Sequence, residues 1–119
     1  MLYLICTPIG NLNDLSLRSI NTLKEVGRIY AEDTRVAANL LQHFQISKKS
    51  IPFHEHNELE QLIDITNALQ DGIDIAVMSD AGAPLISDPG YPLIKKCIEL
   101  EIDFTVLPGP SSVINAVLL

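Results

Sequence analysis

Residues 74–90 read Asp-Ile-Ala-Val-Met-Ser-Asp-Ala-Gly-Ala-Pro-Leu-Ile-Ser-Asp-Pro-Gly, and this stretch decides the fold. It opens with a short apolar run, which is typical of a strand buried on both faces of a parallel sheet. A long loop of small residues follows. Asp88 and Pro89 then give a helix cap with proline at the first helical position. The stretch predicts a strand, a loop and a helix in succession.

Four more apolar runs occur along the chain, at residues 2–6, 28–32, 50–54 and 103–107. A helical pattern separates each run from the next, so strands and helices alternate from beginning to end. Alternation of this kind predicts a three-layer α/β/α fold around an open, five-stranded parallel sheet with right-handed crossovers.

The helical segments are recognised by their caps and apolar stripes. We expect the first helix to open at Asp14 or Ser16 and the second to be capped by Thr34. Asn57 with Glu60 resembles a capping box at the start of the third. The residues expected on buried stripes are Val36, Ala37, Leu40, Leu41, Phe44, Leu59, Leu62, Ile63, Leu69, Leu93, Ile94, Cys97 and Ile98.

The composition limits the class of protein. With 119 residues, 47% of them hydrophobic, the chain predicts one globular domain, residues 1–119. It has no uncharged apolar stretch of about 18 residues, so we expect no membrane span and a cytoplasmic location. We expect Cys6 and Cys97 to be buried thiols. The net charge of −7 predicts that the main contacts to any nucleic acid lie elsewhere.

The carboxyl end reads as a helix that has just begun, with Ser111 as its cap and no closing signal. We therefore expect the chain to be the amino-terminal part of a longer protein.

Ligands of such sheets bind beyond the carboxyl ends of the strands, which directs attention to five loops. The loop after the first strand, residues 7–11, lacks the glycine spacing of dinucleotide-binding folds. No phosphate-binding loop with a glycine-lysine pair occurs either. The sequence thus argues against NAD or a nucleoside triphosphate, and is compatible with a cofactor without phosphate.

Two loops offer polar groups for such a cofactor. In residues 79–90 the small side chains allow close backbone approach, and Asp80 can accept hydrogen bonds from hydroxyls or an amine. In residues 108–112 the hydroxyls of Ser111 and Ser112 stand at a helix start. The alternatives are a structured loop without ligand and an ordinary serine cap.

Segment 32–35 places Glu32, Asp33 and Arg35 at the end of the second strand. The carboxylates can orient a hydroxyl or remove its proton, and the guanidinium can hold a phosphate. The alternative is a capped helix start with a surface ion pair.

His54 and His56 share one face of an extended segment, but no third ligand is evident near them. We therefore interpret them as solvated side chains and expect no metal site.

Taken together, these motifs resemble the tetrapyrrole methylase superfamily, and within it the members that methylate ribosomal RNA. The resemblance covers nearly the whole chain. Tetrapyrrole-modifying members carry a Gly-x-Gly-x-Gly-Asp type of first loop, from which residues 7–12 depart here, and this favours RNA over a porphyrin. The stretches that carry the resemblance are residues 3–12, 31–35, 79–90 and 108–112.

The resemblance implies S-adenosylmethionine as cofactor, folded into a cleft between this domain and a second α/β domain. It also implies a homodimer and, as reaction, 2′-O-methylation of a cytidine ribose in small-subunit (16S) ribosomal RNA. From loop placement we expect Glu32, Asp33 and Arg35 to face the RNA as catalytic residues. The expected cofactor-binding residues are Pro8, Gly10, Asp80, Ala81, Gly82, Ile86, Ser87, Pro110, Ser111 and Ser112.

Three alternatives stay open at this point. A methylase of corrin or porphyrin precursors would share the fold and the cofactor. A non-catalytic α/β module of the phosphoacceptor type would need acidic residues where the first and third strands end, and Cys6, Thr7 and His54 stand there instead. The chain alone would also be inactive if it buried its cleft by dimerising.

Overall fold

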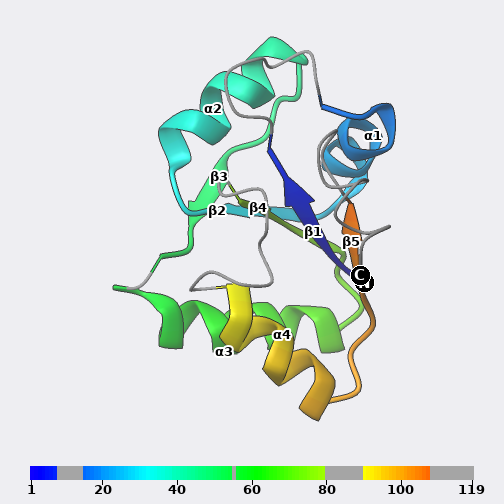
Figure 1. Cartoon of the computed structure of the whole chain (residues 1–119), viewed down its shortest axis with the longest axis vertical. Coiled ribbons are helices and arrows are strands. Elements are labelled where there is room, and N and C mark those ends of the chain that lie inside the picture. Colours follow the sequence, from blue (N-terminus) through cyan, green and yellow to red (C-terminus); the bar gives the residue numbers. More distant parts are fainter. Residues whose placement is uncertain (8–14, 55, 80–89, 108–119) are drawn as a thin grey trace, which may run out of the picture.

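The computed structural model describes residues 1–7, 15–54, 56–79 and 90–107. Strands and helices alternate along them, as predicted (Figure 1). No helix in these ranges is long and apolar enough to cross a membrane. The elements are β1 (Leu2–Cys6), α1 (Leu17–Glu25), β2 (Arg28–Ala31), α2 (Thr34–His43), β3 (Ser50–Pro52), α3 (Glu58–Gln70), β4 (Ile75–Ser79), α4 (Gly90–Glu99) and β5 (Phe104–Leu107).

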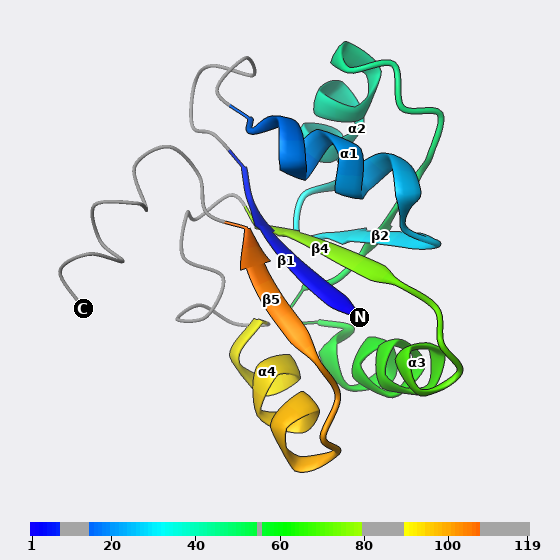
Figure 2. The same ribbon diagram turned by 90° about the vertical axis from the view of Figure 1, so that its right-hand side faces the viewer.

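The five strands form one parallel sheet in the order β3-β2-β4-β1-β5. Helices α1 and α2 cover one face of the sheet, and α3 and α4 cover the other (Figures 1 and 2). The predicted three-layer α/β/α fold is therefore confirmed. The sequence predicted the number and direction of the strands, whereas their order comes from the structure.

Two hydrophobic cores lie on the two faces of the sheet. Successive residues of a strand point to opposite faces, so each central strand supplies both cores. Ile5 and Met78 pack beneath α1 and α2, while Leu4 and Val77 pack against α3 and α4. This double burial is the reason that β1 and β4 read as continuous apolar runs.

Both cysteines are buried, as the sequence predicted. Burial raises the pKa of the Cys97 thiol to about 11, so this thiol stays protonated at neutral pH. Since the thiolate is the reactive form, Cys97 acts as a small core side chain.

Four apolar residues expected on buried helix stripes are exposed instead. Val36 is 39% exposed, Leu59 77%, Ile63 60% and Ile98 63%. A helix on a flat sheet buries only the stripe that touches it, and in α3 the buried residues all lie in the second half. The periodicity therefore located the helices correctly but overestimated the width of their buried faces.

Two strands end earlier than predicted. β2 ends at Ala31 and β3 at Pro52, whereas the apolar runs extended to residues 32 and 54. Proline has no N–H to donate, which limits regular pairing at this edge of the sheet. The Phe53 N–H still donates to the Ala31 carbonyl at 2.9 Å.

Lys48 closes the carboxyl end of α1 from a distant part of the chain. Its Nζ donates to the carbonyl oxygens of Leu23, Lys24 and Val26 at 2.9, 2.5 and 2.6 Å. The last carbonyls of a helix have no partner within it, and an ammonium group at this end also complements the helix dipole. Burial lowers the pKa of Lys48, and the Glu25 carboxylate opposes this shift.

We predict that Lys48→Met lowers the free energy of unfolding by about 1–3 kcal/mol, because three carbonyls lose a charged donor. Urea denaturation monitored by circular dichroism measures the change. Lys49→Met is the matched control, since Lys49 is an exposed neighbour that makes none of these bonds. Equal stability of the two variants would show that the cap contributes nothing.

Candidate functional site

The site is organised by the carboxyl end of β4. This strand lies between β2 and β1 in the sheet. The chain leaves β1 and β2 toward α1 and α2 on one face, and leaves β4 toward α4 on the other (Figure 2). Ligands of open α/β sheets bind where neighbouring strands connect to opposite faces in this way. The topology thus makes the edge around Ser79 a candidate ligand site.

Thr7 fastens the ends of β1 and β4 to each other. The Ser79 carbonyl accepts two bonds from Thr7, one from the backbone N–H at 2.9 Å and one from Oγ1 at 2.7 Å. Both residues are buried, so competition from water is small. The pairing of Cys6 with Ser79 brings the two strands to the same level. The loops that follow β1 and β4 therefore begin side by side, at strand ends that are hydrogen-bonded to each other.

The predicted cofactor-binding residues themselves lie outside the described residues, and the structure tests none of them. These are Pro8, Gly10, Asp80, Ala81, Gly82, Ile86, Ser87, Pro110, Ser111 and Ser112. Thr7, which belongs to this edge, was not singled out from the sequence. Its only signal there is a hydroxyl at the end of an apolar strand.

Segment 32–35 lies at the end of β2, next to β4. Asp33, and not Thr34 as predicted, is the cap of α2: its Oδ1 accepts from the N–H groups of Arg35 and Val36 at 2.9 and 3.3 Å. Both side chains are suitable caps, and the chain reaches helical geometry one residue earlier than expected.

The side chains of Glu32 and Arg35 are exposed at the same edge. Within the described part of the chain, neither forms an ion pair. The structure thus supports the capped helix start of the alternative reading but not its surface ion pair. It leaves a carboxylate and a guanidinium available to a ligand.

The third loop is fixed by Asn57. A capping box with Glu60 was predicted there, but the Asn57 side chain makes no bond to its own helix. Its Oδ1 accepts from the His54 N–H at 2.9 Å, and its Nδ2 donates to the Pro52 carbonyl at 2.9 Å. An amide can bridge two backbone groups at once, which here outweighs the cap.

The two histidines meet within this loop. His54 Nδ1 accepts from the His56 N–H at 3.2 Å, and the rings lie edge to face. No three potential metal-ligating side chains come together among the residues that the structure describes.

A comparison of the whole chain with known families decides its membership. Residues 1–118 match the family described as Tetrapyrrole (Corrin/Porphyrin) Methylases. The chain belongs to this family. Its motifs at the strand ends had indicated the same superfamily.

Relatives in this family carry a more specific name. The chain is 50% identical over 117 residues to "Ribosomal RNA small subunit methyltransferase I" of Streptococcus pyogenes serotype M3. It is 46% identical over 116 residues to the protein of that name in Vibrio cholerae serotype O1. These alignments cover 98% of this chain but 41% and 40% of the relatives, so the chain spans about two fifths of their length.

Solved structures share the fold. The crystal structure of uroporphyrin-III-C-methyltransferase from Thermus thermophilus matches with a TM-score of 0.71 at 16% identity, covering 91% of this chain and 46% of that one. The crystal structure of diphthine synthase matches with a TM-score of 0.73 at 10% identity, covering 92% and 44%. At such identities the likeness concerns the fold alone.

We predict that Asp33→Ala lowers the free energy of unfolding by about 1 kcal/mol, because two N–H groups at the start of α2 lose their acceptor. Asp33→Asn should keep nearly all of the wild-type stability, since asparagine caps a helix equally well. Urea denaturation of both variants is the measurement. A loss of the same size in both would mean that the negative charge, and not the cap, stabilises the helix.

Proposed function

We propose that the complete protein is an S-adenosylmethionine-dependent methyltransferase that methylates the ribose 2′-oxygen of a cytidine in small-subunit (16S) ribosomal RNA. The observation that carries this proposal is the similarity, over nearly the whole chain, to relatives named for small-subunit ribosomal RNA. The arrangement of the carboxyl edge is compatible with it.

The polar groups of this edge suit the proposed cofactor. S-Adenosylmethionine has no phosphate, and neither strand-end loop carries a phosphate-binding glycine motif. When bound, it supplies a methyl group on a positively charged sulfur. Residues of the loops that start at Thr7 and Ser79 would hold it, with Asp80 accepting from hydroxyl or amine groups. The two hydrogen bonds from Thr7 to the Ser79 carbonyl support this role, because they hold the ends of β1 and β4 together where the two loops begin.

Segment 32–35 would receive the RNA. A ribose hydroxyl is a poor nucleophile until its proton is removed, and a positioned base contributes about 10²–10⁴-fold to such a step. We assign this role to Glu32, whose exposed carboxylate has no bond to the backbone of α2. Asp33 holds the helix start in place through Oδ1. The Arg35 guanidinium would bind a phosphate beside the target nucleotide.

The resemblance also supports a homodimer in the cytoplasm, with the cofactor cleft completed by the part of the protein that the longer relatives have in addition. Light scattering of the complete protein tests the dimer: a monomeric mass would contradict it.

We expect Glu32→Gln in the complete protein to lower the rate of methyl transfer to small-subunit RNA by at least about 100-fold, because the proton acceptor is lost. Asp33→Asn should lower it much less, since the cap remains. The assay follows a labelled methyl group and tests the modified position for resistance to alkali, which a 2′-O-methyl group confers.

Glu60→Gln, at an exposed glutamate of α3, is the matched control. Wild-type rates in Glu32→Gln would remove Glu32 from the mechanism. If the complete protein methylated a corrin or porphyrin precursor and did not methylate RNA, the tetrapyrrole alternative would replace the proposed function.

A further inference from the structure

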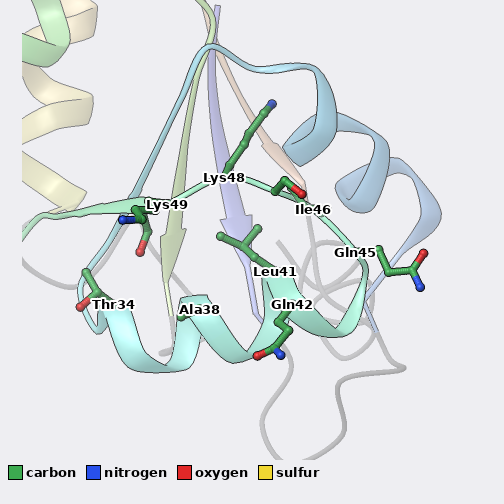
Figure 3. A pocket seen from close by; sticks show the side chains of 10 residues that line it. Thr34, Ala38, Leu41, Gln42, Gln45, Ile46, Lys48 and Lys49 are labelled. Atoms are coloured by element: carbon green, nitrogen blue, oxygen red, sulfur yellow. The ribbon is translucent and has the colours of Figure 1, made fainter.

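An open groove of about 660 Å³ runs between α2 and the start of β3 (Figure 3). It extends from Thr34, in the first turn of α2, to Gln45, beyond the last. Ala38 and Leu41 contribute apolar surface, and Gln42 and Lys49 contribute polar groups. Because Thr34 belongs to segment 32–35, this α2–β3 groove begins at the proposed RNA-facing cluster.

The charge of this region is opposite to that of the chain. Residues 34–54 contain three of the eight lysines and arginines and none of the fifteen acidic residues. Among the described residues, no side chain that lines the groove is acidic. In a protein with net charge −7, a basic region of this kind favours a polyanionic partner.

The two adjacent lysines of the groove have different roles. The Lys48 ammonium is engaged with three carbonyls at the end of α1, and in Figure 3 its side chain extends away from α2. Lys49 is exposed, and no acceptor among the described residues pairs with its ammonium group. Of these two lysines, Lys49 is therefore the one that is available to an incoming anion.

We propose that the α2–β3 groove binds the sugar–phosphate backbone of the RNA substrate, with Lys49 contacting a phosphate. The proposal rests on the proposed function and adds to it a contact surface of this domain. Continuity favours RNA over an acidic protein segment as occupant, because the groove begins at Thr34, which belongs to the same segment as Glu32. Amide groups such as that of Gln42 offer further donors to phosphate or sugar oxygens.

The test measures the affinity of the complete protein for naked small-subunit RNA over a range of salt concentrations. Lys49→Gln should weaken binding about three- to tenfold at physiological salt and reduce the slope of log affinity against log salt by about 0.7–0.9, the value for one lost phosphate contact. Gln42→Glu, which adds a negative charge at the exposed rim, should weaken binding similarly. Lys95→Gln, an exposed lysine on α4 across the sheet, is the matched control and should bind as the wild type does.

Each outcome is decisive. If Lys49→Gln and Gln42→Glu bind RNA as Lys95→Gln does, while the wild type methylates RNA, the groove proposal is wrong and the proposed function stands. If they bind naked RNA normally but lose affinity for the assembled small subunit, the groove contacts ribosomal protein instead. If the wild type neither binds nor methylates RNA, both proposals fall.

Discussion

The pairing of β1 with β4 is the constraint on which the rest of the structure depends. The two strands pair in register from Leu2↔Ile75 to Cys6↔Ser79. In each strand, successive side chains point alternately into one core and the other. A slip by one residue would exchange the two faces of either strand and would place its loop origin at another level. The second bond from Thr7 to Ser79 fixes the register at the end where the loops begin. The two buried cores and the candidate site are thus set by the same contact.

Elements that depend on local pattern could be predicted from the sequence, and those that depend on distant partners could not. Apolar runs revealed the strands because burial on both faces leaves no polar position. The order of the strands carries no comparable signal, since it follows from which helix crosses which face. The cap that Lys48 forms on α1 has no local signal, because the three carbonyls that it binds lie 22 to 25 positions earlier in the chain. The cap of α2 was displaced by one residue because Asp33 and Thr34 suit it equally well.

The candidate site was predictable in place but only partly in role. Parallel strands end at one edge, so the position of segment 32–35 at that edge followed from the fold class. Its place next to the end of β4 follows only from the strand order in the structure. The sequence offered Glu32 and Asp33 as equivalent acids. The structure distinguishes them, because one oxygen of Asp33 accepts two backbone N–H groups and is held by the helix start. Both side chains are exposed, but Asp33 is already hydrogen-bonded to the backbone, which leaves Glu32 as the acid that we propose as the base.

An acidic protein can bind a polyanion at a basic surface when its acidic residues lie farther from that surface than the screening length. This length is about 8 Å at physiological ionic strength. Residues 34–54 carry no acid and include the exposed Lys49, while the Glu25 carboxylate acts on the neighbouring Lys48. Helix α2 carries segment 32–35 at its start and lines the groove along its length, and Ala37, Leu40 and Leu41 anchor it on the sheet. In the proposed complex, one rigid element would fix the distance between the bound backbone and the reacting hydroxyl. Positioning of this kind can supply a large part of the acceleration of a methyl transfer.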